Sequence, residues 1–241
     1  MLQDGLTVEN LTVVRGGKQV VHGVSLDCPS GEITALIGAN GAGKSSTVMA
    51  IAGAIPASGG RVTWRGQNIT GLSADATRRA GLALVPEGHP VLADLSVLDN
   101  LRVAASHLPV AKANSAVEHA LSLFPELTPR LKTAASALSG GQKQMVLIGQ
   151  AIVSAPQFLL IDELSLGLAP AIVTRLANCL EKLADEGMGI VLIEQFTTIA
   201  LRLSKRAYVL ERGRVAYAGS TETLRQDPSI LHSAYLSVGG S

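Results

Sequence analysis

Cysteine and histidine are scarce in this sequence. It has two cysteines, Cys28 and Cys179, which lack CxxC spacing, and five histidines that are scattered without the spacing of metal ligands. We therefore expect neither a disulfide nor a zinc site. No apolar run reaches the ~18 residues that a membrane-spanning helix needs. Residues 1–4 also lack the basic and then apolar order of a signal peptide, so these absences predict a cytosolic chain.

Aromatic residues and an excess of one charge are also lacking. Aromatic residues make up 3% and apolar residues 47% of the chain, which predicts an aliphatic core of parallel strands covered by helices. The 20 basic and 19 acidic residues nearly balance, so there is no general attraction to nucleic acid or anionic lipid. We expect no nucleic-acid partner. No linker rich in proline and serine interrupts the sequence, which predicts one domain over residues 1–241.

A glycine-rich segment at residues 38–46, GANGAGKSS, has the pattern G-x-x-x-x-G-K-[ST] between an apolar strand at residues 33–37 and a helix that begins near Ser46. This context indicates a phosphate-binding loop, because glycines and a helix N-terminus both favour close approach of phosphate. Lys44 is expected at the β- and γ-phosphates and the Ser45 hydroxyl at Mg²⁺. The alternative is a glycine-rich turn without a ligand. The predicted nucleotide contacts are Gly38, Ala39, Asn40, Gly41, Ala42, Gly43, Lys44, Ser45 and Ser46.

Hydrophobic periodicity divides the rest of the chain into three parts. Near-alternating apolar residues predict antiparallel strands that begin near Leu6, Val20 and Arg61 and form an N-terminal β subdomain. From Glu87 to about Ala155 the period becomes helical. Alternating strand and helix patterns predict a parallel core sheet, with elements at residues 82–85, 158–163, 170–185 and 189–194. The predicted fold class is α/β, a P-loop NTPase with a helical subdomain inserted at about residues 88–155.

Local signals mark several other elements. Ser96 and Asp99 have the spacing of a capping box, which predicts a helix through about His107. After the core, two short strands are expected at residues 207–210 and 215–218, followed by a helix that Ser220 caps.

Acidic residues end two of the core strands. The carboxyl ends of parallel strands share one edge of a sheet, so Gly38, Asp162 and Glu194 should converge there. Asp162 is expected to hold Mg²⁺, directly or through water. Glu163 is expected to act as general base or to orient the attacking water. The alternative for this pair is a solvated acidic strand end.

A second helix start that suits an anion lies at residues 138–145, LSGGQKQM. Ser139 and two glycines precede a helix that we expect to run to about Ser154. One nucleotide does not readily need two such helix termini from the same chain. This segment therefore suggests contact with a nucleotide held by a neighbouring subunit.

Four motifs together resemble those of ABC-type ATPases. GANGAGKSS resembles the Walker A loop, LSGGQ the family signature, FLLIDE the Walker B strand and SLGLAP the D-loop, in the family's order. The resemblance covers essentially the whole chain. It implies two such domains packed head to tail, with two ATP molecules between loop and signature. It also implies nucleotide contacts from Ser139, Gly140, Gly141 and Gln142.

A narrower resemblance is to the shorter ATP-binding subunits of branched-chain amino acid importers, which usually pair with a second, different ATPase. VPEG at residues 85–88, IEQ at 193–195 and AYL at 234–236 are similar to segments of that group. The resemblance implies that Glu87 offers an oxygen to Mg²⁺ or water, and that Gln195 donates to the γ-phosphate.

Three positions depart from the family's pattern. Arg15 lies where the family stacks an aromatic residue on adenine, Leu164 replaces a proline, and Gln150 replaces an arginine. The Arg15 guanidinium can still stack on the base, although a plain surface arginine is an equal alternative.

The resemblance leads to a functional hypothesis. The chain would be the ATP-hydrolysing subunit of an importer, peripheral to the cytoplasmic face of the membrane and bound to permease subunits. A substrate-binding protein would take part indirectly. The permease contact is expected at residues 88–95, whose apolar members include Pro90, Val91, Leu92 and Leu95, with packing into the core as the alternative. The rival hypotheses are a soluble ABC ATPase outside transport and a weakly hydrolysing regulatory partner in a heterodimer.

Overall fold

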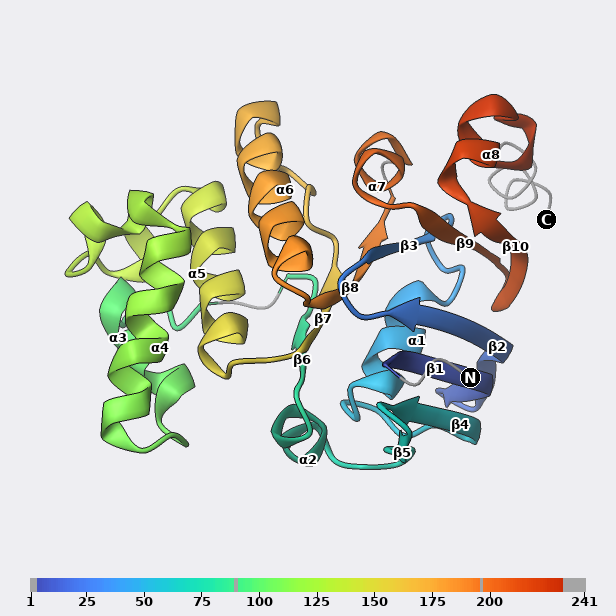
Figure 1. The fold of residues 1–241 in the computed structure, drawn as a ribbon, viewed down its shortest axis with the longest axis horizontal. Helices are drawn as coiled ribbons and strands as arrows, with labels where there is room; N and C mark the ends of the chain where they lie inside the picture. The colour runs from blue at the N-terminus through green and yellow to red at the C-terminus, as the bar shows by residue number, and fades with distance from the viewer. Residues whose placement is uncertain (1–3, 89–90, 196, 232–241) are drawn as a thin grey trace.

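The computed structural model describes residues 4–88, 91–195 and 197–231. Two β-sheets lie side by side in the α/β part of the molecule, and a group of helices forms the other part (Figure 1). Both cysteines are buried free thiols. No helix in the described ranges is long and apolar enough to cross a membrane.

The smaller sheet is antiparallel and confirms the predicted N-terminal β subdomain. Its strand order is β2-β1-β4-β5. Leu6, Val8 and Val13 of β1 are buried, as expected for a strand with one face on a core. The strands are β1 (Gly5–Arg15), β2 (Lys18–Pro29), β4 (Gly59–Trp64) and β5 (Gln67–Asn68).

The larger sheet has the order β10-β9-β3-β8-β7-β6, and its strands from β9 to β6 pair in parallel. Every residue of β3, β7 and β8 is buried, so these largely apolar strands are covered on both faces. The β9–β10 hairpin and the helix after it confirm the predicted C-terminal elements. The strands are β3 (Ile33–Ile37), β6 (Leu82–Val85), β7 (Phe158–Asp162), β8 (Gly189–Glu194), β9 (Arg206–Glu211) and β10 (Arg214–Ser220).

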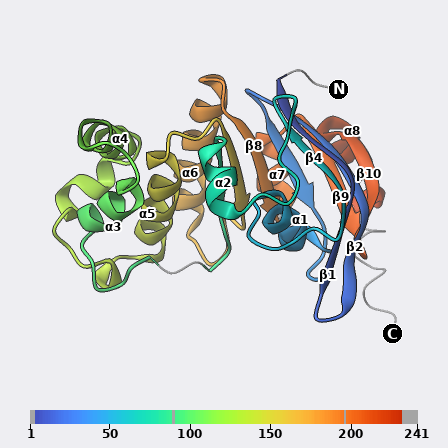
Figure 2. The same ribbon diagram turned by 90° about the horizontal axis from the view of Figure 1, so that it is seen from below.

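Helices cover the sheets from different sides. Helix α1 (Lys44–Ile51) packs against strands of both sheets, whereas α6 (Pro170–Asp185) and α7 (Thr197–Leu203) pack on β8. Figures 1 and 2 show α6 on the side of the parallel sheet away from α1. Ser220 caps α8 (Thr221–Gln226) as predicted. Residues 234–236, the third segment of the narrower resemblance, lie outside the described residues.

The inserted helices form a layer at one end of the molecule. They are α3 (Val97–Ala105), α4 (Val110–Leu123) and α5 (Gly140–Val153), with two short 3-10 turns at Pro125–Arg130 and Ala135–Ala137. A small apolar cluster that includes Leu101, Val117 and Val153 joins the three helices. Ser96 caps α3, because its hydroxyl oxygen accepts a hydrogen bond from the Asp99 amide. In a capping box the Asp99 carboxylate would accept from the Ser96 backbone amide, but here it accepts from the Ser96 hydroxyl.

Two short helices were missing from the sequence-based expectation. These are α2 (Ala74–Arg79) and α7, which have six and seven residues. Fewer than two helical turns contain too few apolar repeats to show a helical period. Ser73 caps α2 by accepting from the Ala76 amide, which is the local signal that was available.

Candidate functional site

The segment between β3 and α1 forms a tight loop that ends at a helix N-terminus. Ile37, the last residue of β3, pairs with Glu194 of β8 and with Val209 of β9, so the loop leaves the middle of the parallel sheet. Gly43 has φ +100°, and a side chain there would meet the Val20 carbonyl oxygen at 2.8 Å. No side chain caps α1, so the amides of its first turn are available to an anion.

Lys44 is buried at the start of α1. Its ammonium donates to the carbonyl oxygens of Gly38 and Ala39, at 2.7 and 3.1 Å. Burial lowers the pKa of Lys44, and the nearby carboxylates of Glu163, Asp162, Glu87 and Glu194 oppose that shift. The structure therefore places one buried cation among four acidic side chains.

Two of those acidic side chains stand at the end of β7. Asp162 is 1% exposed, and neither of its carboxylate oxygens meets a hydrogen-bond partner in the described structure. Burial raises the pKa of Asp162, although the Ser45 hydroxyl lies near enough to favour the ionised form. Glu163 has a left-handed backbone, φ +60°, and its buried Oε2 also lacks a partner. Burial likewise raises the pKa of Glu163.

Buried carboxylate oxygens without partners are costly, so these three call for a ligand. Oxygen donors from a carboxylate and a hydroxyl suit Mg²⁺, which keeps several waters and few protein ligands. Asp162 and Ser45 fit this requirement. In the described ranges no group of three or more histidine, cysteine and acidic residues has metal-binding geometry. Glu87 is exposed just beyond β6, and its charge raises the pKa of Asp162 and Glu163.

Glu194 has a partner set that the sequence did not reveal. It is fully buried, and its carboxylate accepts from the Leu164 amide, the Ser165 amide and the Ser165 hydroxyl at 3.1, 3.0 and 2.7 Å. Burial raises its pKa to about 7, against the lowering effect of the Ser165 bond. The signal in the sequence is an acidic residue at the end of a buried apolar strand. The bond from Leu164 needs a backbone N–H, which the proline of the family's pattern would lack.

The signature segment forms the capped start of α5. The Ser139 hydroxyl accepts from the Gln142 amide at 3.3 Å, and the Gln142 side chain accepts from the Ser139 amide at 3.1 Å. A side chain at Gly141 would lie 2.6 Å from Ile172 of α6, so glycine lets the two helices approach closely. The starts of α1 and α5 belong to different parts of the molecule, with β7 and β8 between them (Figures 1 and 2).

The other predicted residues are dispersed. Arg15 ends β1 at the exposed tip of the β1–β2 hairpin, and half-buried Gln195 follows β8 directly. Leu164 is 1% exposed and packs in the core. The Gln150 amide donates to the backbone and side-chain oxygens of Asn100, at 3.3 and 3.1 Å, which ties α5 to α3.

The expected permease segment is divided between core and surface. Val91 is buried in the main apolar cluster, so at this residue the alternative of packing into the core holds. Leu92 is 45% exposed, and Pro90 lies outside the described residues. The buried Asn100 side chain holds this loop by donating to the carbonyls of Leu92 and Leu95.

A family model described as ABC transporter matches residues 21–165. The chain belongs to this family. As an ABC transporter ATP-binding subunit it binds ATP and hydrolyses it. The match spans the phosphate loop, the signature and the β7 carboxylates. All three segments therefore belong to the pattern of one family, although the start of α5 lies away from the phosphate loop in the fold.

Curated ABC relatives cover almost the whole chain. The high-affinity branched-chain amino acid transport ATP-binding protein BraG of Pseudomonas aeruginosa is 38% identical over 96% of this chain and 99% of its own length. A probable branched-chain amino acid transport protein, LivF of Archaeoglobus fulgidus, is 34% identical over 85% of this chain and 87% of its own length. The lipopolysaccharide export system ATP-binding protein LptB of Escherichia coli strain K12 is 30% identical over 93% of this chain and 94% of its own length.

Solved structures confirm the ABC ATPase fold. An ATP-binding subunit of an ABC transporter is similar with a TM-score of 0.81 and 30% identity, over 98% of this chain and 100% of that one. A nucleotide-free ATP-binding cassette has a TM-score of 0.86 at 24% identity, over 95% and 97% of the two chains. The predicted fold class is confirmed.

Proposed function

We propose that this chain is the ATPase subunit of an importer for branched-chain or related hydrophobic amino acids. The observation that carries the proposal is the 38% identity to BraG over nearly the full length of both chains. The lipopolysaccharide export relative is less similar, at 30% identity. In this proposal the chain acts as one domain over residues 1–241 and lies on the cytoplasmic face of the membrane. The transported amino acid contacts the permease and the substrate-binding protein.

The phosphate loop supplies nucleotide affinity in this proposal. Backbone amides of residues 38–46 face the phosphates, and the Lys44 ammonium turns from its own loop carbonyls to the β- and γ-phosphates. Ser45 and Asp162 would hold Mg²⁺, which would supply positive charge to offset that of the phosphates. Glu163 orients water or removes its proton, and Gln195 and Glu87 border the γ-phosphate. Arg15 stacks on the base through its guanidinium plane.

Replacing Lys44 with alanine is expected to weaken ATP binding about 10- to 100-fold, because charge-assisted hydrogen bonds contribute ~1.5–3 kcal/mol each. Equilibrium titration with a fluorescent ATP analogue and Mg²⁺ measures the effect. Lys112→Ala, which removes an exposed charge from α4, is the matched control. Equal dissociation constants for Lys44→Ala and the wild type would show that the loop does not hold the phosphates.

The separation of the two helix starts supports a head-to-tail dimer. In such a dimer the Ser139 hydroxyl and the amides of residues 140–142 close on the ATP bound at the partner's phosphate loop. The partner is a second copy of this chain or a different ABC ATPase. Gln142 keeps its cap on α5 and so fixes the direction of Ser139.

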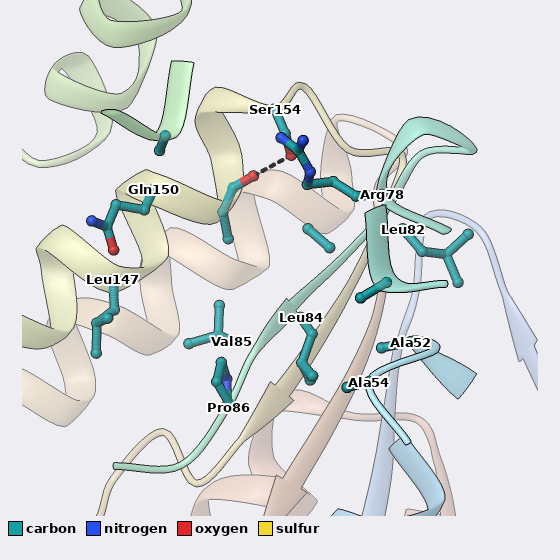
Figure 3. Close-up of a pocket in the computed structure, with 14 residues that line it drawn as sticks. Ala52, Ala54, Arg78, Leu82, Leu84, Val85, Pro86, Leu147, Gln150 and Ser154 are labelled. Atoms are coloured by element: carbon teal, nitrogen blue, oxygen red, sulfur yellow. Dashed lines mark hydrogen bonds between the residues drawn. The ribbon is translucent and has the colours of Figure 1, made fainter. Parts of the chain in front are cut away.

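A groove between the α/β core and the inserted helices is the proposed seat of the permease. It has a volume of about 360 Å³, and Figure 3 shows Leu147 and Gln150 of α5 facing Ala52 and Ala54, with Leu84 of β6 between them. Small alanine side chains on several walls, among them Ala52, Ala83 and Ala104, keep the groove open. We infer that a short cytoplasmic helix of the permease docks here.

Filling this groove is expected to uncouple the assembly. Ala104→Trp places a large ring in the groove. Because the ring would occupy the space of the docked permease helix, amino acid uptake by the assembled transporter should fall at least about tenfold. ATP hydrolysis by the purified chain should persist. Val103→Trp is the control, because Val103 is the exposed neighbour on α3 outside the groove. Normal uptake by Ala104→Trp would place the permease elsewhere.

Two rival functions make different predictions in one assay. ATP hydrolysis is measured for the purified chain, then with permease and binding protein in membranes, with and without leucine. The proposed importer shows hydrolysis that leucine and binding protein stimulate. A soluble ABC ATPase would be indifferent to the permease. A regulatory partner would hydrolyse poorly in every mixture unless a second ATPase were present.

A further inference from the structure

The end of β8 is bonded to the residues that follow Glu163, the base in the proposed function. The Glu194 carboxylate accepts three hydrogen bonds, two from backbone amides and one from a hydroxyl, and all three donors belong to Leu164 and Ser165. The Glu163 amide itself donates to the Ile193 carbonyl at 3.1 Å. The backbone around Glu163 is therefore attached to β8 on both sides.

Glu163 needs such support. Its φ of +60° lies in the left-handed region, where a residue with a side chain is strained and persists only if its surroundings hold it. Its buried Oε2 has no partner, so no bond from its own side-chain tip fixes that oxygen. The bonds to Glu194 are the contacts that hold the next two residues in place.

Burying the Glu194 carboxylate in this position also costs desolvation free energy. It is fully buried, and a buried carboxylate is tolerated only when donors surround it. An apolar residue at the end of β8 would continue the apolar run of the strand at lower cost. The choice of an acid here, with donors that all lie just after Glu163, points to a role in the reaction.

We propose that Glu194 is a positioning residue for ATP hydrolysis, whose carboxylate fixes residues 164–165 and thereby aims Glu163 at the attacking water. The proposal rests on the role given to Glu163 above. Glu194 acts through the backbone and does not touch the nucleotide. The same bonds set the start of the segment 165–170, which leads from the site into α6.

Three variants of the full chain test this role, assayed with Mg²⁺ and ATP below their melting temperatures. Glu194→Ala removes all three acceptor contacts and should lower kcat at least about tenfold with little change in KM, since misplacing a reacting group by about 1 Å can cost ~100-fold. Glu194→Gln should retain most of the turnover, because its carbonyl oxygen still accepts the amides and its NH₂ can donate to Ser165. The kcat of Ser165→Ala should lie between the values for Glu194→Ala and Glu194→Gln.

The outcomes separate a positioning role from a structural one. If Glu194→Ala lowers the melting temperature but leaves kcat of the folded protein unchanged, the role is purely structural and the proposal fails. If Glu194→Gln is as impaired as Glu194→Ala, the charge itself is needed and positioning is the wrong account. Where Glu194→Ala does not fold, Ser165→Ala decides, and an unchanged kcat overturns the proposal.

Glu163→Gln, measured in parallel, separates this inference from the proposed function. Wild-type turnover in Glu163→Gln would remove the role of Glu163 and with it the role of Glu194. If Glu163→Gln is inactive while Glu194→Ala keeps the wild-type kcat, only the inference about Glu194 is wrong.

Discussion

Glu163→Gln is expected to stop turnover while ATP still binds. The amide preserves the shape of the side chain but cannot accept a proton, and loss of a general base typically costs ~10²- to 10⁴-fold. Burial raises the pKa of Glu163, which makes its carboxylate a stronger base than that of an exposed glutamate. Single-turnover hydrolysis of labelled ATP measures the chemical step, and a parallel titration measures ATP affinity.

The matched control is Glu118→Gln, which removes an exposed carboxylate from α4. It should hydrolyse ATP at the wild-type rate. Single-turnover hydrolysis by Glu163→Gln at the rate of this control would eliminate Glu163 as the base. Asp162 would then be the remaining carboxylate at the end of β7 with unpaired oxygens.

Ser139→Arg is expected to abolish hydrolysis in the assembled protein without weakening ATP binding to the isolated chain. The new side chain at the start of α5 would obstruct the approach of the facing subunit, and loss of one well-placed donor to a reacting group already costs ~10²- to 10³-fold. Steady-state ATPase activity at high protein concentration and ATP affinity at low concentration separate the two effects.

Ser136→Arg is the control for this variant, since Ser136 is an exposed serine three residues before Ser139. It should keep its activity. In a homodimer, mixing Ser139→Arg with Lys44→Ala should restore part of the activity, because one of the two shared sites is then intact. Weak ATP binding by the Ser139→Arg monomer, or normal hydrolysis by its assembly, would contradict the head-to-tail arrangement.

Much of this fold is encoded in local sequence patterns. The apolar run before Asp162 and the period of residues 170–185 predict β7 and α6, and the phosphate loop and signature are contiguous motifs with chemical reasons for each residue type. Their positions could be predicted because each depends on neighbours in the sequence.

Other features depend on contacts between distant segments. The bonds from Leu164 and Ser165 to Glu194 join residues about thirty positions apart, and nothing in either segment alone specifies them. Val91 is apolar like Leu92, yet one is buried and the other exposed, because the path of the loop past Asn100 decides it. The unpaired oxygens of Asp162 likewise become visible only once the sheet is assembled.

The central claim is that Asp162 and Glu163, at the end of β7, form one Mg²⁺–ATP site together with the phosphate loop. A second subunit completes this site. A structure of Glu163→Gln with Mg²⁺ and ATP tests it most directly, because blocked turnover retains the nucleotide. The account predicts Mg²⁺ beside Ser45 and Asp162, the γ-phosphate beside residue 163, and a signature segment of the facing subunit on that phosphate. ATP bound away from Asp162, or enclosed by the Ser139 of its own chain, would contradict it.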